Sequence, residues 1–300
     1  MVIDELSKAA GKQAAPLRTK RYGSKLKWRV GLTATPVSQN FEKLYGMTRI
    51  IDQGSALGTS KQRYMQKYFV PDYMGYNWTI REGAAEGILG LISPLMHLMA
   101  DTKEVDLPPV TYHDIQFNMP PVTRQVYNDM KNHMVVESKG KTVDAANQAV
   151  KSGKLRQISC GFMYAPDGTR VILDQSRMNA ADQWWRALDG RPGLIFYEFV
   201  EDGLRLKSWM PDNVTLAQIQ SMSHGVDGLQ HKFSDVLFYM PVWSRDAMEQ
   251  AVGRVWRQGQ THAVDVTTLM CDNSVDQIAS SRVAGNAKWM DLLRQHIKGS

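Results

Sequence analysis

One segment near the C-terminal end of the sequence carries the residues whose types and spacing point most directly to chemistry. Gln250, Arg254 and Arg257 follow one another at i, i+4 and i+7, so a helix would gather them on one face. Ser244 suits a helix N-cap and Gly259 suits a helix stop, which predicts one helix between them. Guanidinium groups match phosphate oxygens and stay charged throughout turnover. The segment predicts a phosphate-binding face; the alternative is a solvated basic face on an ordinary surface helix.

Two adjacent carboxylates form a second candidate for chemistry. Asp4 and Glu5 follow the apolar pair Val2 and Ile3, as expected for acids at the end of a strand. Hydrolysis of a nucleotide uses an acid to hold Mg²⁺ and a second acid to orient the attacking water. Acidic pairs are common in solvated turns, so this pair gains meaning only from the motifs that follow it.

The elements that must position these residues alternate between strands and helices. Strands are predicted where apolar residues alternate or run continuously, and helices where they recur every three to four residues. The alternation favours a doubly wound α/β architecture. The predicted strands are 28–32, 111–117, 194–197 and 236–240, and the predicted helices are 40–51, 83–99, 122–136 and 244–259.

Composition excludes some classes of protein and favours others. The 300 residues carry a net charge of +6, which fits a polyanionic partner without establishing one. No apolar run approaches the ~20 residues that a membrane helix needs, and the acidic start argues against a signal peptide. Cys160 and Cys271 lie far apart with no Cys-x-x-Cys pattern. We therefore expect a cytoplasmic protein, without a disulfide or zinc site and with no membrane partner.

Together the motifs resemble those of superfamily 2 DNA helicase-like ATPases of the Swi/Snf type. Residues 250–257 resemble motif VI (Gln-x-x-Gly-Arg-x-x-Arg), and the Arg-x-Gly-Gln extension to Gln260 is similar to the Swi/Snf branch. Residues 223–230 resemble motif V and residues 31–36 resemble motif III. Leu155-Arg156-Gln157-Ile158 is similar to a stretch early in the second lobe of this family, and Leu57-Gly58 with Tyr68-Phe69 resembles its phage and bacterial versions.

The resemblance implies an α/β fold with two RecA-like lobes, each built on a parallel sheet as in P-loop NTPase helicase cores. Residues 1–107 would form the C-terminal part of an incomplete first lobe, with motifs II and III and a helical insertion over 55–105. Residues 108–300 would form the second lobe, with motifs IV to VI. The two prolines at 108 and 109 suit the junction because they stiffen a connection and disfavour helix.

The resemblance also implies the cofactors ATP and Mg²⁺, duplex DNA as partner, and a role for each motif residue. Asp4 and Glu5 would hold Mg²⁺ and activate water, while Gln250, Arg254 and Arg257 would act at the transferring phosphate. The residues implied to approach the nucleotide are Thr33, Thr35, Gly225, Asp227 and Gly228. The residues implied to contact nucleic acid are Arg156 and Ser223.

A phosphate-binding loop of the form Gly-x-x-x-x-Gly-Lys-Ser/Thr is missing from the sequence. Gly140-Lys141-Thr142 matches its end, but Val135 replaces the first glycine; Gly11-Lys12 is followed by Gln13. We therefore expect a chain truncated before motif II, inactive or nearly so unless a P-loop segment joins it in cis or in trans.

Two other functions remain open from the sequence. The chain could be a non-catalytic DNA-binding module whose second lobe still grips phosphates. It could also be a scaffold that recruits other proteins through the aromatic-rich residues 64–78. The favoured prediction is the C-terminal part of an ATP-dependent DNA helicase or translocase.

Overall fold

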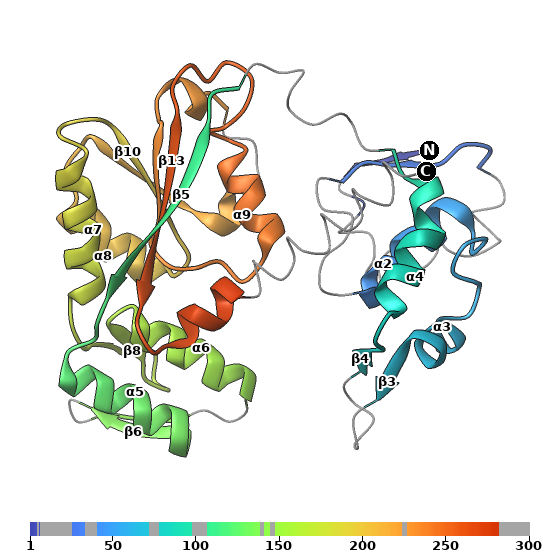
Figure 1. The fold of residues 1–300 in the computed structure, drawn as a ribbon. Coiled ribbons are helices and arrows are strands. Elements are labelled where there is room, and N and C mark those ends of the chain that lie inside the picture. Colours follow the sequence, from blue (N-terminus) through green and yellow to red (C-terminus); the bar gives the residue numbers. More distant parts are fainter. Residues whose placement is uncertain are drawn as a thin grey trace. The chain divides into compact units, whose positions relative to one another are not determined.

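The computed structural model describes residues 1–4, 6, 26–33, 41–71, 78–97, 107–138, 141–144, 148–223 and 227–281. Contacts divide the chain into two compact units, one formed by Met1–Asp101 with Ala284–Ser300 and one formed by Thr102–Val283. The sequence placed the boundary between the lobes after residue 107. Figure 1 shows the elements of both units, each of which is described here by itself.

In the residues that the structure describes, the first unit combines short strands with α-helices and a 3₁₀ helix. Strands β1 and β2 pair in parallel, with Val2 opposite Val30, whereas β3 and β4 form an antiparallel pair. The elements in chain order are β1 (Val2–Ile3), β2 (Val30–Gly31), α2 (Phe41–Asp52), α3 (Lys61–Tyr68), β3 (Phe69–Pro71), β4 (Trp78–Ile80), α4 (Ala84–Ile92) and the 3₁₀ helix η3 (Ser93–Leu95).

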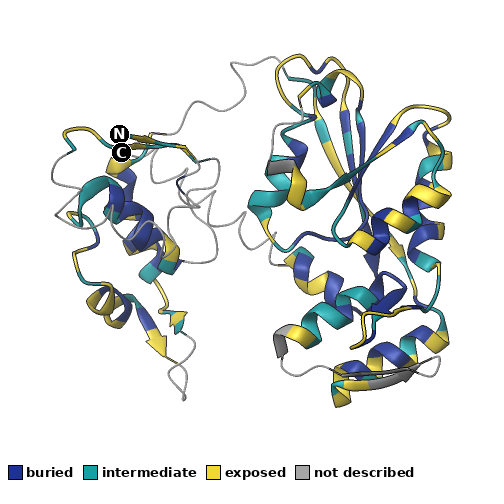
Figure 2. Cartoon of the chain, turned by 180° about the vertical axis from the view of Figure 1, so that it is seen from behind, coloured by how far each residue is buried: buried dark blue, intermediate teal, exposed yellow. Residues whose placement is uncertain are grey.

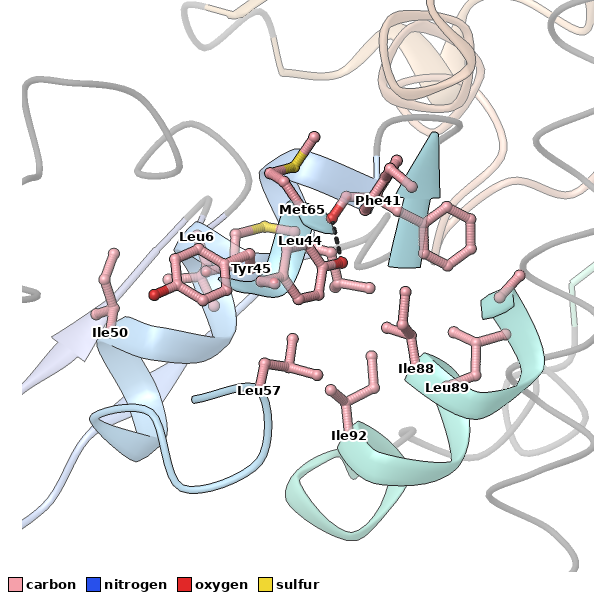
Figure 3. Packing of buried hydrophobic residues seen from close by; sticks show 14 residues of the cluster. Leu6, Phe41, Leu44, Tyr45, Ile50, Leu57, Met65, Ile88, Leu89 and Ile92 are labelled. Carbon is pink, nitrogen blue, oxygen red and sulfur yellow. Dashed lines mark hydrogen bonds between the residues drawn. The ribbon is translucent and has the colours of Figure 1, made fainter. Parts of the chain in front are cut away.

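The core of this unit lies between α2, α3 and α4. Apolar residues at helical spacing bury one face of α2, and Ala85, Ile88, Leu89 and Ile92 of α4 belong to the same core (Figure 3). The hydroxyl of the buried Tyr64 donates a hydrogen bond of 2.8 Å to the carbonyl of Phe41. The buried hydrophobic residues of these helices are Phe41, Leu44, Tyr45, Met47, Ile50, Tyr64, Met65, Ala85, Ile88, Leu89 and Ile92.

Three predictions for this unit need correction. The strand predicted over 28–32 pairs only at Val30–Gly31, and Trp28, on its supposed apolar face, is 81% exposed. The insertion is not purely helical, because the β-branched and aromatic residues of β3 and β4 form a strand pair. The helix predicted to Met99 ends at Ile92, because Pro94 has no backbone N–H to continue the α-helical hydrogen bonds and a 3₁₀ turn follows.

A five-stranded sheet organises the second unit. All neighbours are parallel and the strand order is β11-β10-β12-β13-β5. The predicted α/β class with a parallel sheet is confirmed. The strands are β5 (Val110–Phe117), β10 (Gly193–Tyr197), β11 (Val214–Gln218), β12 (Asp235–Phe238) and β13 (Val264–Cys271). The chain runs from β10 outward to β11 and then returns to β12 on the other side of β10, which makes the space between β10 and β12 the topological switch point.

Helices cover both faces of this sheet, and the central strands β10 and β12 are buried on each side, whereas the edge strand β5 is largely exposed (Figure 2). Ile195 and Leu237 face the core beneath α7 and α8, whereas Leu194 and Phe196 face the core beneath α9. The helices are α5 (Pro121–His133), α6 (Gln148–Ser159), α7 (Ser176–Ala187), α8 (Val200–Trp209), α9 (Arg245–Val252) and residues 275–281.

Smaller elements complete the unit. Two antiparallel pairs flank the helices, and two 3₁₀ helices lie between β11 and β12. The helix predicted over 122–136 ends at His133, because Met134 adopts a left-handed conformation and β6 begins directly after it. These elements are β6 (Val135–Ser138), β7 (Lys141–Asp144), β8 (Phe162–Tyr164), β9 (Arg170–Ile172), η5 (Ile219–Ser223) and η6 (Leu229–His231).

Candidate functional site

The residues predicted to meet a nucleotide from the second unit gather at the amino edge of the sheet. Strands β12 and β13 are parallel and in register, with Asp235 opposite Asp265. Segments that precede the two strands must therefore lie at the same edge. Residues 227–234 lead into β12 and residues 253–263 lead into β13, so motifs V and VI meet there.

The motif VI helix is shorter than its sequence predicted. Ser244 is its N-cap, as expected, and accepts a 3.4 Å hydrogen bond from the Ala247 amide. Helix α9 ends at Val252 because Gly253, a poor helix former, takes the C-cap. The prediction of one helical face with Gln250, Arg254 and Arg257 is therefore wrong.

Gln250 stays on the helix and donates a 3.3 Å hydrogen bond to Asp246. Arg254 and Arg257 instead belong to the turns that follow the helix. The two arginines are thus presented by a loop, whose shape depends on contacts outside α9.

Two side chains shape that loop. The indole Nε1 of Trp256 donates a 2.7 Å hydrogen bond to the carbonyl of Pro108. The buried side-chain amide of Gln260 donates to the carbonyls of Phe233 and Val255, at 2.9 and 3.3 Å. Such tertiary bonds replace helical ones and tie the loop to the segments before β5 and β12. Sequence reasoning singled out Gln260 as a family marker, and the structure gives it a folding role.

An ion pair connects the motif V and motif VI segments. Arg257 Nη1 lies 3.3 Å from Asp227 Oδ1, and both side chains are open to solvent, at 45% and 83% exposure. Gly228 and Gly259 have positive φ angles of 87° and 96°, which favour glycine at both turns. A Cβ on Gly259 would lie 2.8 Å from the His231 ring, so the two segments pack closely. Gly225 lies outside the described residues.

Asp4 and Thr33 belong to the first unit, at the carboxyl edge of its parallel strand pair. The Leu32 amide donates a 2.8 Å hydrogen bond to the carbonyl of Ile3, which sets the ends of β1 and β2 side by side. Asp4 follows β1 as an exposed turn residue, and Thr33 lies just beyond β2. The Asp4 carboxylate supplies oxygen atoms of the kind that Mg²⁺ prefers as ligands. Glu5 and Thr35 lie outside the described residues.

Arg156 lies at the opposite, carboxyl edge of the second sheet. Its Nη1 donates a 2.6 Å hydrogen bond to Glu198 Oε1, and its Nη2 bonds the other carboxylate oxygen. The guanidinium carbon lies 5.5 Å from the ring centre of Phe199 and 5.4 Å from that of Trp243. The predicted contact of Arg156 with nucleic acid stays a prediction. The same holds for Ser223, the last residue of η5.

Sequence reasoning missed a buried ion pair at the same edge. Arg177 and Asp276 are paired with side chains only 0% and 1% exposed. Arg177 also donates to the carbonyls of Ser159, Tyr239 and Leu269, at 3.1, 2.7 and 3.1 Å. Burial by itself would lower the pKa of Arg177, but Asp276 raises it above its usual range, so the pair stays ionised. A sequence signal was lacking because the two residues are far apart in the chain.

A second buried acid lies on the helix that follows β10. Burial raises the pKa of Asp202 from 3.8 to about 7, although the charges of Arg177 and Arg205 oppose the shift. Its neighbour Glu201 is neutralised instead by Arg170, at 2.9 Å. The first turn of α8 therefore holds one paired carboxylate and one that is partly protonated near neutral pH.

The aromatic residues of the first unit serve mainly its core. Tyr64 packs against Tyr45 and Phe69, with ring centres 5.0 and 5.6 Å apart. An open pocket of about 390 Å³ lies beside them, lined by Glu42, Lys61, Gln62, Met65, Gln66 and Trp78. None of the residues predicted to bind nucleotide or nucleic acid lines this pocket.

Two classes of feature are missing from the part of the chain that the structure describes. Within it, no group of three or more His, Cys, Asp or Glu side chains could hold a metal ion. No helix there is long and apolar enough to cross a membrane. Residues 140–142, which match the end of a phosphate-binding loop in sequence, do not form one. Lys141 and Thr142 belong to antiparallel strand β7 and not to a loop that enters a helix.

Comparisons with known proteins give distant likenesses. No family model matches the chain. Putative protein p41 of Acyrthosiphon pisum secondary endosymbiont phage 1 is 23% identical over an alignment of 319 positions, which covers 96% of this chain and 68% of the relative. The chain thus resembles a phage protein whose name states no activity.

Two solved structures are also similar. The C-terminal part of the Fun30 ATPase domain gives a TM-score of 0.39 at 12% identity, over 64% of this chain and 98% of that one. The Sulfolobus solfataricus SWI2/SNF2 ATPase core in complex with dsDNA gives a TM-score of 0.36 at 19% identity, over 99% and 72%. At TM-scores below 0.5, neither likeness by itself identifies the function of this chain.

Proposed function

We propose that this chain is part of an ATP-dependent DNA translocase of the superfamily 2, Swi/Snf type, with phage relatives. The observation that carries the proposal is the contact between Asp227 and Arg257 at the amino edge of the second sheet. It joins the segment that resembles motif V to the segment that resembles motif VI. These motifs were paired from their sequences alone, so their meeting in space is independent support.

The second unit supplies positive charge for the phosphates in this proposal. Arg254 and Arg257 neutralise charge that develops on the γ-phosphate, and Gln250 orients the loop or the phosphate from the end of α9. An arginine in this role is worth ~10³–10⁵ in rate. Asp227 pairs with Arg257 until the nucleotide binds. The pair then opens readily, because an exposed pair of this kind contributes only ~0–1 kcal/mol.

The first unit supplies the acidic half of the chemistry. We assign Asp4 and Glu5 to Mg²⁺ and water, and Thr33 and Thr35 to the link between nucleotide state and movement. Bound Mg²⁺ neutralises phosphate charge during transfer. We assign Gly225, Asp227 and Gly228 of the second unit to contact with the nucleotide. A segment with a P-loop, in cis or in trans, completes the site, since backbone amides must cradle the phosphates.

We propose that the protein translocates on duplex DNA. The net charge of +6 favours contact with DNA phosphates, and Ser223 and Arg156 are the assigned contacts. Swi/Snf-type proteins in general move along duplex DNA without separating its strands, and we assign the same activity here. The proposed setting is the cytoplasm of a bacterial host.

The test is ATP hydrolysis with and without duplex DNA, on the chain alone and with a P-loop-bearing first-lobe segment added. We expect turnover that needs the added segment and that duplex DNA stimulates. Salt-sensitive DNA binding with no hydrolysis in any mixture would contradict the motor and favour the non-catalytic DNA-binding module. Hydrolysis by the chain alone would show that no added P-loop is required.

A further inference from the structure

We propose that Arg156 is a preformed binding site for a backbone phosphate of nucleic acid, and that Glu198 occupies this site as an internal carboxylate until a phosphate displaces it. The inference rests on the proposed function only in its choice of DNA as the ligand. It assigns to Glu198 the role of a latch that weakens DNA binding.

The surroundings of Arg156 hold its guanidinium group in one orientation. Phe199 and Trp243 lie within cation–π distance of it, at 5.5 and 5.4 Å. The sulfur of Met240 lies 3.7 Å from Nη2. The edge of the guanidinium group that carries Nη1 and Nη2 faces Glu198. Nη1 donates to Oε1 and Nη2 donates to Oε2 of that carboxylate. The protein thus presents a fixed, two-pronged donor and fills it with its own anion.

That edge is shaped for a phosphate as well as for a carboxylate. Parallel N–H groups of a guanidinium bind two oxygens of either anion with similar geometry. A phosphate diester carries the same charge as Glu198 and can bond Arg156 in the same way. The displaced carboxylate stays nearby and repels the phosphate, so Glu198 weakens DNA binding. The aromatic contacts need not change, so Arg156 requires little reorganisation when the anions exchange.

The position of the pair in the fold also suits a ligand. Glu198 and Phe199 follow β10, and Met240 and Trp243 follow β12, so all four flank the switch point of the sheet. In open parallel sheets, ligands bind outside the carboxyl ends of the strands at such a point. Arg156 reaches this place from the last turns of α6.

Exposure distinguishes this pair from the neighbouring buried pair. The side chains of Arg156 and Glu198 are 12% and 19% exposed, whereas those of Arg177 and Asp276 are 0% and 1% exposed. A phosphate on a duplex cannot reach a fully enclosed arginine, but it can compete at a partly open edge. Of these two pairs, the Arg156 pair is the one that combines a fixed guanidinium with access from solvent.

The acids near the site leave Glu198 as the main obstacle to an anion. Glu201 is neutralised by Arg170 at 2.9 Å. Asp202 is buried, and its surroundings favour the protonated form near neutral pH. Removal of the Glu198 charge should therefore convert the edge into an open cationic site.

The experiment measures affinity for a fixed duplex DNA over a series of salt concentrations. It compares the wild-type chain with Glu198→Gln, with Glu198→Gln/Arg156→Gln and with Asp182→Asn. Asp182 pairs with Arg186 at 2.7 Å on α7, so this control removes the same charge from another ion pair of the unit. Urea unfolding of each variant checks that its fold is retained.

We expect Glu198→Gln to bind DNA about 3- to 10-fold more tightly and to steepen the salt dependence by ~0.9, the value for one added phosphate contact. The double variant should lose the gain, and Asp182→Asn should change affinity less than twofold. If Glu198→Gln fails to fold, Glu198→Asp, which keeps the charge but shortens the reach, should give a smaller gain in the same direction.

DNA binding by the wild-type chain with no gain in Glu198→Gln, or an equal gain in Asp182→Asn, would overturn the latch and leave the proposed motor standing. A gain that needs Arg156, in a chain without DNA-stimulated ATP hydrolysis in any mixture, would support the latch while the motor fails. Absence of DNA binding in every variant would overturn the latch as well.

Discussion

The two edges of the second sheet use arginine in opposite ways. At the amino edge, Arg257 lies in a turn after α9 and meets Asp227 across an exposed 3.3 Å contact. At the carboxyl edge, Arg177 is buried, paired with Asp276 and bonded to three carbonyls. Because an exposed pair contributes little and a broken buried pair costs several kcal/mol, the first arginine is available to a ligand and the second is committed to the fold. Side-chain type alone could not separate these roles.

The largest expected effect concerns catalysis at the amino edge. Replacing Arg254 by Ala should lower DNA-stimulated ATP turnover by ~10³–10⁵, because charge on the transferring phosphate loses its stabilisation. The free energy of unfolding should fall by much less than the ~3–5 kcal/mol of a broken buried ion pair, because Arg254 is half-buried and not enclosed. Turnover and urea unfolding are measured on the same preparation. A loss of turnover accompanied by a loss of stability as large as that expected for Arg177 would place Arg254 with the structural arginines. It would contradict the contrast between the two edges of the sheet.

The next largest effect concerns stability at the carboxyl edge. Arg177→Met should lower the free energy of unfolding by about 3–5 kcal/mol, because it leaves the Asp276 carboxylate buried without a counter-charge. Arg186→Met is the matched control, since Arg186 is 69% exposed in its pair with Asp182. Urea unfolding of both variants checks the prediction. Similar small losses in the two variants would show that burial does not separate the two kinds of arginine.

Asp202 tests whether groups near the carboxyl edge are buried, because burial makes its contribution to the free energy of unfolding depend on pH. Its pKa is raised from 3.8 to about 7, so folding favours the protonated acid. The stability that it contributes is fully present below pH 4, falls as pH rises to 7, and is then lost. Asn at position 202 cannot ionise. The free energy of unfolding of Asp202→Asn, relative to that of the wild-type chain, should therefore rise by on the order of 1 kcal/mol for each pH unit from pH 4 to pH 7.

Unfolding of the wild-type chain and of Asp202→Asn would be compared at pH 5, 6, 7 and 8. A difference that stays constant from pH 5 to pH 7 would show that Asp202 is ionised throughout, as an exposed acid would be. Arg177, Arg205, Cys160 and Tyr239 surround this group and remain unchanged in the variant.

The smallest effect tests how the amino-edge loop is held. Trp256→Phe removes the 2.7 Å hydrogen bond to the Pro108 carbonyl and should lower the free energy of unfolding by ~1 kcal/mol. The exposed Trp209 supplies the matched control through Trp209→Phe, which should have less effect. Thermal or urea unfolding reports both. Equal effects would mean that the loop does not depend on this bond.

The sequence predicted the sheet of the second unit better than the loops around it. The continuous apolar run at 194–197 became a buried parallel strand because burial on both faces requires such a run. The apolar face of α2 was also predicted, since Phe41, Leu44 and Tyr45 recur at helical spacing. These elements are determined by local pattern.

The errors arose where tertiary contacts decide the conformation. Helix α9 ends early because Gly253 stops it and because Trp256 and Gln260 bond to distant carbonyls, which no local pattern records. Likewise Glu198 and Arg156 are 42 residues apart in the chain, and the tertiary fold brings them together. The site residues themselves were predicted from motif resemblance, and their roles remain predictions.

The most direct test of phosphate chemistry at the amino edge is hydrogen–deuterium exchange, with and without Mg²⁺ and a slowly hydrolysed ATP analogue, on the chain together with a P-loop-bearing segment. Exchange should slow at residues 227–231 and 253–260, where Asp227, Arg254 and Arg257 would close on the nucleotide, and should stay unchanged at residues 155–160. Slower exchange confined to residues 155–160 and 198–202, with none at the amino edge, would contradict this assignment.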